Sequence, residues 1–535
     1  MVPPPSGAPG PGRAAPGIGY RWSVPSARKL RSPAVLLTVS AVVLSGCLAP
    51  KQQTTVPGDA EQPTAEAGQD LDSLYAQEVA WSACGEGYDC ATVVAPLDWD
   101  APEAGSIDLA VKRHASTGDA ADRIGSLLIN PGGPGGSGVE FLDYAVTGVL
   151  GQDVLDAYDV VAFDPRGVAG SSAVSCGDDA VVDAYLIADV PLESQADVDA
   201  ARDMSRVFGE GCLEATGALL GEVDTVSAAR DMDLLRAVLG DEQLYYTGFS
   251  YGTFLGATYA GLYPENVGRL VLDGALDPSM TNDELVVGQA VGFENALRAY
   301  VEDCQAGAGC PLTGTVDDGL AQISKLIERI AAEPLAAGEG YTLNSTLAFY
   351  GIVVTLYDDG SWPYLTQALA EAITENTGEV LLQLANIYLE RTPDGQYLSN
   401  SMVAFPAINC LDYPTEVREF DEMVSFAQEV SAVAPTFGED FAMALGCEAW
   451  PFQSTVERAP IAAPGAAPIL VVGTTGDPAT PYEWSVALAD QLDSGQLLTW
   501  QGEGHTAYGR SNQCVEDAVE TYLLQGEMPQ DGLVC

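Results

Sequence analysis

The chain has 535 residues, which is enough for one large elaborated domain or for two to three ordinary ones. Hydrophobic residues make up 47% and charged residues 18%, a balance typical of a globular protein and unlike a disordered or fibrous one. The formal net charge of −54 excludes nucleic acid as a natural partner, because such a surface repels phosphate backbones. It would attract cationic ligands, although solubility or salt tolerance is the simpler explanation.

A signal-peptide pattern stands near the N-terminus. Basic residues at positions 28, 29 and 31 precede the apolar run 34–44, which is too short to span a bilayer as an ordinary helix. Leu-Ser-Gly-Cys at 44–47 resembles the lipobox of bacterial lipoproteins. We therefore predict a lipoprotein-type signal peptide over 1–46, lipidation of Cys47, and an exported protein that is anchored to the outer face of the cell membrane or secreted. Ordinary secretion, with Cys47 removed or unmodified, is the alternative.

The segment 47–70 is rich in Gln, Thr, Pro, Glu and Gly and has no apolar periodicity, so we expect a flexible tether. Beyond it, apolar β-branched runs alternate with helical stretches, which indicates a mostly parallel sheet. The predicted strands are Ala91–Pro96, Ile107–Lys112, Ser126–Ile129, Val160–Phe163, Leu244–Thr247, Leu270–Leu272, Pro468–Gly473 and Gln496–Trp500.

The strand pattern is interrupted between residues 276 and 464, where helical patches such as Gly319–Ala332 and Pro363–Ala385 dominate. This organisation predicts a core in two parts, 71–275 and 465–535, with a helical cap inserted over 276–464. No stretch after Cys47 is long and apolar enough to be a transmembrane helix. Any contact with the membrane would then be made through a lipid anchor only.

The cysteine count agrees with export. Eleven cysteines are present, and lipidation of Cys47 would leave an even number for disulfides in an oxidising compartment. Sequence neighbours close the smallest loops, which suggests the pairs Cys84–Cys90, Cys176–Cys212, Cys304–Cys310, Cys410–Cys447 and Cys514–Cys535, although other connectivities stay open. Zinc is the competing interpretation, but the chain has no CxxC pair and only two histidines, so no metal is expected.

Ser250 lies in the segment Gly248-Phe249-Ser250-Tyr251-Gly252, where a predicted strand runs directly into a helix. A nucleophile elbow needs glycines on both sides of the serine, because the turn is too tight for side chains there. In a chain with 57 glycines the motif alone could arise by chance, so the strand–turn–helix context supports the prediction. We predict Ser250 as a nucleophile.

A glycine-rich loop, Asn-Pro-Gly-Gly-Pro-Gly-Gly-Ser-Gly at 130–138, directly follows another predicted strand. An oxyanion hole takes one backbone N–H from the residue after the nucleophile and another from such a loop, so Tyr251 and Gly133 are the candidates. A phosphate-binding loop is the rival interpretation. The segment lacks the Gly-Lys-Ser/Thr ending of a P-loop and the acidic partner of a dinucleotide fold, and no cofactor is expected.

Asp477 follows the predicted strand 468–473, and His505 lies in a glycine-rich loop after the last strand. His114, the other histidine, lies at the end of an early strand, where a structural role is expected. The chain order Ser250, Asp477, His505 is the order used by α/β-hydrolases. We therefore predict an α/β-hydrolase fold with a mostly parallel sheet and an inserted helical cap, and these three residues as a catalytic triad.

The chain resembles the exported tripeptidyl aminopeptidases of actinobacteria, relatives of proline iminopeptidases that include mycobacterial cell-envelope lipoprotein hydrolases. The resemblance covers residues 81–535 and rests on Cys90-Ala-Thr-Val-Val-Ala-Pro-Leu-Asp98, Asn130–Gly138, Phe163-Asp-Pro-Arg-Gly-Val168, Gly248–Gly252, Asp477-Pro-Ala-Thr-Pro-Tyr-Glu-Trp484 and Gly504-His505-Thr506. It implies a serine peptidase that releases short peptides, usually tripeptides, from free amino termini, with Ser250, Asp477 and His505 as the triad. The lipobox is a departure, because several relatives are freely secreted.

Exopeptidase specificity requires a carboxylate that pairs with the ammonium group of a peptide substrate. The candidates are Glu294 and Asp412 in the predicted cap and Glu140 beyond the glycine loop, although in a chain with 76 acidic residues each is more simply a solvated surface group. The alternative function is a carboxylesterase or lipase-like hydrolase of cell-envelope esters. A non-catalytic lipoprotein that binds peptides for uptake is a further rival.

Two other charged segments are interpreted as structural. Asp164-Pro165-Arg166-Gly167 predicts a turn held by an Asp/Arg pair. Asp231, Asp233 and Arg236 lie on a predicted helix before the nucleophile strand, where capping and surface pairing explain them.

Overall fold

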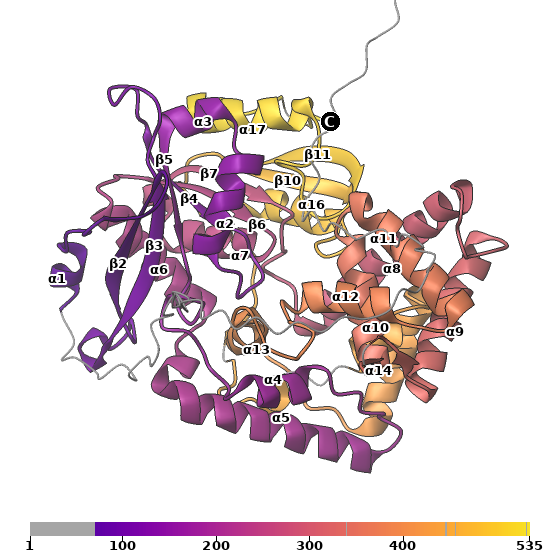
Figure 1. The fold of residues 1–535 in the computed structure, drawn as a ribbon. Coiled ribbons are helices and arrows are strands. Elements are labelled where there is room, and N and C mark those ends of the chain that lie inside the picture. The colour runs from indigo at the N-terminus through magenta and orange to yellow at the C-terminus, as the bar shows by residue number, and fades with distance from the viewer. Residues whose placement is uncertain (1–69, 339, 444–446, 455, 531) are drawn as a thin grey trace, which may run out of the picture. The chain divides into compact units, whose positions relative to one another are not determined.

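A nine-stranded sheet runs through the computed structural model, which describes residues 70–338, 340–443, 447–454, 456–530 and 532–535 (Figure 1). The sheet has the order β1-β2-β3-β5-β4-β6-β7-β10-β11. Its strands are β1 (Ser82–Gly85), β2 (Tyr88–Pro96), β3 (Ser106–His114), β4 (Gly125–Asn130), β5 (Tyr158–Phe163), β6 (Leu244–Phe249), β7 (Val267–Asp273), β10 (Ile469–Gly476) and β11 (Gly495–Glu503). The expected signal peptide, Cys47 and residues 47–69 of the expected tether lie outside the described residues.

The sheet is mostly parallel, as the sequence predicts. Strands β5, β4, β6, β7, β10 and β11 pair in parallel, whereas β1, β2 and β3 add an antiparallel extension that joins at β5. All eight predicted strands coincide with strands of this sheet, with Pro468 just outside β10. The edge strand β1 was not predicted, because its four residues are all exposed and show no apolar alternation.

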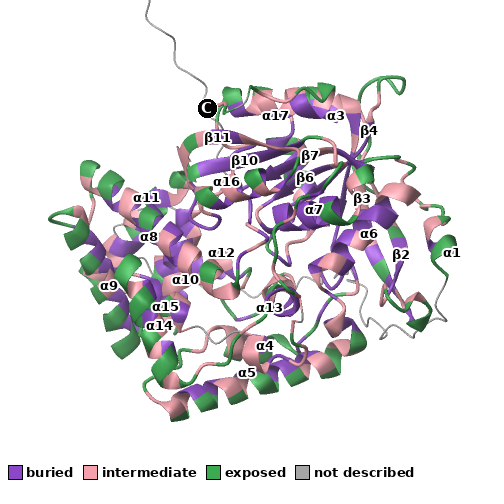
Figure 2. Ribbon diagram, turned by 180° about the vertical axis from the view of Figure 1, so that it is seen from behind, coloured by how far each residue is buried: buried purple, intermediate pink, exposed green. Residues whose placement is uncertain are grey.

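Buried residues of the central strands alternate between two hydrophobic clusters on opposite faces of the sheet. Leu128, Val161 and Leu272 belong to one cluster, and their chain neighbours Leu127, Val160 and Val271 belong to the other. The period of two explains why these strands are apolar throughout, since helices cover both faces of the sheet. The residues of the central strands are mostly buried (purple in Figure 2). Each such side chain contributes roughly 1.5–3 kcal/mol of burial free energy.

Helices supply side chains to both clusters. Helices α6 (Thr225–Val238), α7 (Tyr251–Leu262) and α16 (Tyr482–Gln491) contribute to the cluster of Leu128. Helices α2 (Gly138–Tyr144), α3 (Gln152–Ala157) and α17 (Gln513–Gln525) contribute to the cluster of Leu127. The result is a three-layer α/β arrangement, with the sheet between two helical layers.

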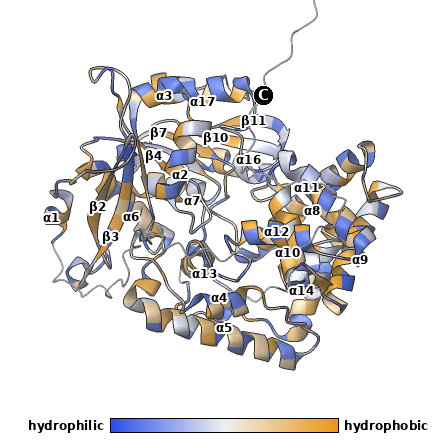
Figure 3. Cartoon of the chain, viewed as in Figure 1, coloured by the Kyte–Doolittle hydropathy of each residue, from blue (hydrophilic) through white to orange (hydrophobic). Residues whose placement is uncertain are grey.

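The chain between β7 and β10 is helical and has a hydrophobic cluster of its own. Figure 3 shows its helices with apolar sides turned toward one another and polar sides outward. They are α8 (Asn282–Ala306), α9 (Val316–Ala332), α10 (Ser345–Leu356), α11 (Trp362–Ala370), α12 (Glu379–Tyr388), α13 (Ser401–Asp412), α14 (Phe420–Val433) and α15 (Gly438–Ala442). A two-stranded sheet of β8 (Leu335–Ala336) and β9 (Thr342–Leu343) accompanies them.

One of the predicted helical patches forms a single helix, and the other is divided into two. Gly319–Ala332 lies within α9. Pro363–Ala385 is divided into α11 and α12, because the turn between them places Asn376 in the left-handed region, with φ of 57°. No helix in the described ranges is long and apolar enough to cross a membrane.

Further helices come from the chain before β6. Helix α1 (Leu71–Tyr75) precedes the sheet, and α4 (Asp179–Leu186) and α5 (Gln195–Thr216) lie between β5 and β6. Helix α5 contacts α14 and the short helix Cys447–Ala449, so a segment from the first part of the chain packs against the helical segment that follows β7. Sequence order alone does not indicate this contact.

Five disulfides connect the described residues, and they confirm the pairs that sequence order suggests. They join Cys84–Cys90, Cys176–Cys212, Cys304–Cys310, Cys410–Cys447 and Cys514–Cys535. Structural disulfides persist in oxidising compartments and are rare in the cytosol. They indicate an exported protein.

The prediction of an ion pair between Asp164 and Arg166 is wrong. Arg166 lies 2.7 Å from Asp231, and both side chains are fully buried. Asp164 instead accepts hydrogen bonds from the Ser137 hydroxyl at 2.6 Å and the Gly170 amide at 2.9 Å. Asp231 is therefore part of the core and not of a surface pair.

Candidate active site

Ser250 occupies the sharp turn between β6 and α7 at the carboxyl edge of the sheet. Its backbone has φ of 55° and ψ of −125°, a conformation that L-residues rarely adopt. A side chain at Gly248 would place Cβ 2.4 Å from the Gly252 carbonyl oxygen, and one at Gly252 would place it 2.9 Å from Asn130 Oδ1. The flanking glycines are therefore required by close contacts, as in a nucleophile elbow.

The glycine loop after β4 lies directly against this turn. A Cβ on Gly132 would meet the Phe249 carbonyl oxygen at 2.4 Å and the Tyr251 nitrogen at 3.1 Å. The Gly132 amide donates to the buried Asn130 side chain at 2.9 Å, which fixes the start of the loop. The described part of the chain offers the Gly133 and Tyr251 amides no hydrogen-bond acceptor, so both can serve an oxyanion.

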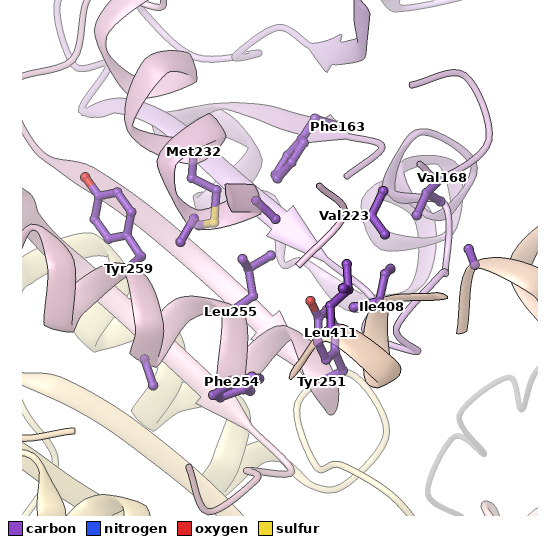
Figure 4. Close-up of a cluster of buried hydrophobic side chains, with 14 of the residues drawn as sticks. Phe163, Val168, Val223, Met232, Tyr251, Phe254, Leu255, Tyr259, Ile408 and Leu411 are labelled. Carbon is purple, nitrogen blue, oxygen red and sulfur yellow. The ribbon is translucent and has the colours of Figure 1, made fainter. Parts of the chain in front are cut away.

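The Tyr251 side chain points away from this site and into the core. Figure 4 shows it beside Ile408 and Leu411, which belong to α13. Its hydroxyl shares a short hydrogen bond with the Thr225 hydroxyl, and burial raises its pKa well above the usual value. The side chain therefore anchors the start of α7 while the backbone amide remains at the turn.

Asp477 and His505 form a hydrogen-bonded pair. His505 Nδ1 lies 2.9 Å from both carboxylate oxygens of Asp477, whose side chain is fully buried. The Asp477 carboxylate also accepts the backbone amides of Ala479, Thr480 and Thr506 at 2.8–3.1 Å. These donors fix the carboxylate against the imidazole, and its contact with Nδ1 selects the tautomer in which Nδ1 carries the proton.

Thr480 adds a second contact to the same pair. Its hydroxyl donates to Asp477 Oδ2 at 3.0 Å and lies 3.3 Å from His505 Nδ1. Thr480 also lines the cavity that contains Ser250. It was missed by sequence reasoning, because a threonine three residues after an aspartate has no distinctive signal.

Ser250 and His505 are brought to the same edge of the sheet, although no hydrogen bond joins their side chains among the described residues. The Ser250 amide donates to the Asp273 carbonyl oxygen at 2.9 Å. A Cβ on the next residue, Gly274, would lie 3.3 Å from His505 Cε1. Catalytic hydrogen bonds are often long without substrate, and this placement is consistent with a serine and its base.

Asp273, at the end of β7, is a second buried carboxylate at the site. Its oxygens accept the Ala507 amide at 3.0 Å and the Tyr508 amide at 2.7 Å. Burial raises its pKa to about 6, which the two amide donors and nearby His505 partly oppose. Asp273 was not predicted from the sequence, although an aspartate at the carboxyl end of a predicted parallel strand is a usable signal.

A cavity of about 150 Å³ opens above Ser250, between the turn and the helical segment. Its lining is dominated by aromatic and aliphatic side chains, and none of the described lining residues is charged. The lining comprises Gly133, Pro134, Ser250, Tyr251, Leu276, Leu285, Gln289, Phe293, Phe349, Val353, Tyr357, Tyr388, Phe405, Asn409, Tyr413, Phe441, Ala479 and Thr480. Such an apolar cleft with few polar groups is typical of a substrate site.

The three candidate carboxylates lie outside this lining. Glu294 follows the lining residue Phe293, is buried, and accepts the Thr436 amide at 2.8 Å and its hydroxyl at 3.0 Å. Asp412 accepts the Thr225 amide at 2.9 Å and its hydroxyl at 2.6 Å, and burial raises the pKa of Asp412 to about 7.

Glu140 is exposed on α2. Partial desolvation is the main cause that raises its pKa, and repulsion from Glu390 and Asp164 raises it further. His114, the other histidine, ends β3 beside Tyr88, with ring centroids 5.5 Å apart. It lies outside the cavity lining. Its position agrees with a structural role.

The fold and the residues at this edge define a serine hydrolase of the α/β-hydrolase fold. A family described as TAP-like protein matches residues 434–535. Serine protease Hip1 of Mycobacterium tuberculosis is 36% identical over 524 residues, 93% of this chain and 96% of that protein. Carboxylesterase B of the same organism is 36% identical over 497 residues, 90% of this chain and 93% of that protein.

The tripeptidyl aminopeptidase of Streptomyces lividans is 31% identical over 470 residues, 85% of this chain and 86% of that protein. These similarities extend over both parts of the sheet and over the helical segment between them. The chain belongs to the TAP-like family of α/β-hydrolases, in agreement with the resemblance derived from its motifs.

Proposed function

We propose that this protein is an exported serine exopeptidase that releases short peptides, most simply tripeptides, from free amino termini. The observation that supports this best is the convergence of Ser250, the glycine loop and the Asp477–His505 pair at the carboxyl edge of the sheet, next to an apolar cavity that Ser250 and Gly133 line. Two relatives that are named serine protease and tripeptidyl aminopeptidase favour peptides as substrates.

In the proposed reaction His505 removes the proton of Ser250, and Oγ attacks the scissile carbonyl. The Gly133 and Tyr251 amides donate to the oxyanion, each contributing about 3 to 4 kcal/mol of transition-state stabilisation. The imidazolium then protonates the leaving amine, and water releases the acyl group in a second step. Asp477 holds the imidazole in the required tautomer and stabilises its protonated form.

The acyl part of the substrate occupies the cavity beside Phe349, Val353 and Tyr388 in this proposal. Because the described lining is uncharged, a charged side chain next to the scissile bond would lose its hydration without gaining a partner. Peptides with apolar residues on the acyl side are therefore the expected substrates.

Of the three candidate carboxylates, Glu294 is the best partner for the substrate's ammonium group. It directly follows the lining residue Phe293 in α8, and its carboxylate is held in place by the amide and hydroxyl of Thr436. Asp412 is less suitable, because burial favours its neutral form. Glu294→Gln should therefore reduce the preference for free over acetylated amino termini.

A lipid anchor at Cys47 is the proposed means of attachment to the outer face of the membrane. The lipobox-like sequence 44–47 supports it, and the five disulfides fit an exported chain. Metabolic labelling with an alkyne fatty acid should tag the wild-type protein and not Cys47→Ala. Equal labelling of both would reject the anchor.

The function is tested by incubating the purified protein with a mixed peptide library and identifying the products by mass spectrometry. We expect short N-terminal peptides from free amino termini, with no product from Ser250→Ala and wild-type products from the control Ser324→Ala on α9. A fluorophosphonate should label the wild type and the control only. Cleavage within acetylated peptides would instead define an endopeptidase.

A carboxylesterase acting on cell-envelope esters is the second candidate. The uncharged, aromatic cavity and the similarity to carboxylesterase B favour it. The kcat/KM values for an Ala-Pro-Ala amide and for a p-nitrophenyl ester of matched acyl size separate the two. Because esters are intrinsically more reactive, only the absence of amide cleavage together with rapid ester cleavage would select the esterase.

A further inference from the structure

The loop that carries His505 is bound to the end of α10, a helix that lies between β7 and β10. The backbone amide of His505 donates to the carbonyl oxygen of Tyr357, the C-cap residue that follows α10, at 2.8 Å. The last carbonyl groups of a helix have no partner within the helix. Here the backbone of the predicted base satisfies one of them.

Side-chain contacts repeat this connection. The rings of Tyr357 and His505 meet edge to face, with centroids 5.5 Å apart and an interplanar angle of 85°. The contact is close, because a Cβ on Gly504 would lie 2.8 Å from the Tyr357 carbonyl oxygen. Tyr357 also lines the substrate cavity, so one residue contacts both the cavity and the histidine.

Arg510 joins the two ends of the histidine loop to the same helix end. It donates to the carbonyl oxygens of Glu503 and Thr506 at 3.1 Å, on either side of His505. It also pairs with Asp358, the residue after Tyr357, at 3.1 Å. A cation near the C-terminus of a helix is stabilised by the helix dipole, which favours this position for Arg510.

We propose that Arg510, Asp358 and the carbonyl group of Tyr357 form a clamp that positions His505, so that the helical segment between β7 and β10 takes part in catalysis. Arg510 and Asp358 are positioning residues, since they act through the loop and lie outside the cavity lining. The clamp orients the imidazole toward Ser250 together with Asp477. This inference rests on the proposed role of His505 as the base.

The clamp is tested with Arg510→Met, Arg510→Lys and Asp358→Asn, assayed on a tripeptide amide. Values of kcat are expressed per active site titrated to completion with a fluorophosphonate, so misfolded molecules do not count. The matched control is Arg298→Met, which removes an ion pair to Asp317 at 2.7 Å between α8 and α9. His505→Ala tests the base itself.

We expect Arg510→Met to lower kcat about 30-fold and Asp358→Asn about threefold, with KM changed less than about twofold. Arg510→Lys should restore part of kcat, because an ammonium group still donates to the loop carbonyls. The double variant Arg510→Met/Asp358→Asn should be no slower than Arg510→Met alone, because Arg510→Met already removes the ion pair with Asp358. The control should match the wild type.

Two results would overturn the clamp while leaving the proposed function intact. One is an unchanged kcat in Arg510→Met together with inactive His505→Ala. The other is a rise in KM at constant kcat, which would assign Arg510 to substrate binding. Full activity of His505→Ala would instead reject the proposed function.

Discussion

The backbone amide of Ser250 donates a hydrogen bond to the carbonyl oxygen of Asp273 at 2.9 Å. The side chain of Asp273 meanwhile accepts the amides of Ala507 and Tyr508, two and three residues after His505. One buried residue at the end of β7 therefore holds both the turn of Ser250, the proposed nucleophile, and the loop of His505, the proposed base. Its own strand, β7, lies between β6 and β10. Ser250 directly follows β6, and Asp477 directly follows β10.

Asp273→Asn should lower kcat about 10- to 100-fold. The new side-chain NH2 group would face the backbone N–H of Ala507 or Tyr508, so a buried donor would lose its acceptor at a cost of about 1–3 kcal/mol. Steady-state kinetics on a tripeptide amide measure the effect. Asp241→Asn is the matched control, since Asp241 accepts the Ser126 amide at 3.1 Å at the start of β4. Equal losses in both variants would contradict a specific role of Asp273.

Gly132→Ala should nearly abolish reaction of Ser250 with a fluorophosphonate. The added Cβ would lie 2.4 Å from the Phe249 carbonyl oxygen, and φ of 95° disfavours any side chain, so the loop must move away from the Tyr251 amide. The labelling rate is the measurement. Gly240→Ala, with φ of 86° and open space around its Cβ, controls for backbone strain and should label at the wild-type rate.

Asn130→Ala should reduce kcat about tenfold or more with little change in KM. The Asn130 side chain holds the Gly132 amide at 2.9 Å, and its loss frees the loop that presents the Gly133 amide to the oxyanion. Asn386→Ala removes another buried asparagine, one that accepts from Arg391, and should leave kcat unchanged. A KM effect alone in Asn130→Ala would assign the loop to substrate binding.

Asp412→Asn should change how stability depends on pH. Burial raises the pKa of Asp412 to about 7, above its value in the unfolded chain, so its contribution to stability is full below about pH 4 and is lost as pH rises to about 7. The wild type should lose on the order of 2 to 3 kcal/mol relative to the variant between pH 5 and pH 8. Urea unfolding at both pH values measures this difference.

The same variant separates structure from substrate recognition. Asp412 contacts Thr225 at the start of α6 through both oxygens, so its replacement should leave the preference for free over acetylated amino termini unchanged. A lost preference would restore Asp412 as the partner of the substrate's ammonium group.

Local patterns were sufficient to predict much of this molecule. The buried strands are recognisable in the sequence as short β-branched runs between turns. The turn at Ser250 requires its two flanking glycines, because a side chain at Gly248 would clash with Gly252 four residues later. The cysteine pairs followed from short sequence separations in most cases. Such features depend on neighbours along the chain, which the sequence displays directly.

Other features depend on residues that are distant in the chain. Arg166 has an aspartate two residues away, yet its partner is Asp231, because a buried guanidinium pairs with the carboxylate that the fold brings beside it. Tyr357 does not stand out in the sequence, and the contacts of Asp273 and Tyr357 to the His505 loop span more than a hundred residues.

The glycine turn that carries Ser250, the proposed nucleophile, could thus be predicted from the sequence, because local backbone sterics impose its pattern on neighbouring residues. The surroundings of Ser250 could not be predicted in this way. The uncharged lining of the cavity, the links between α10 and the histidine loop, and the engagement of Asp412 and Glu294 with threonines arise when separate segments pack together. Those contacts follow from three-dimensional packing, for which no local pattern in this chain is diagnostic.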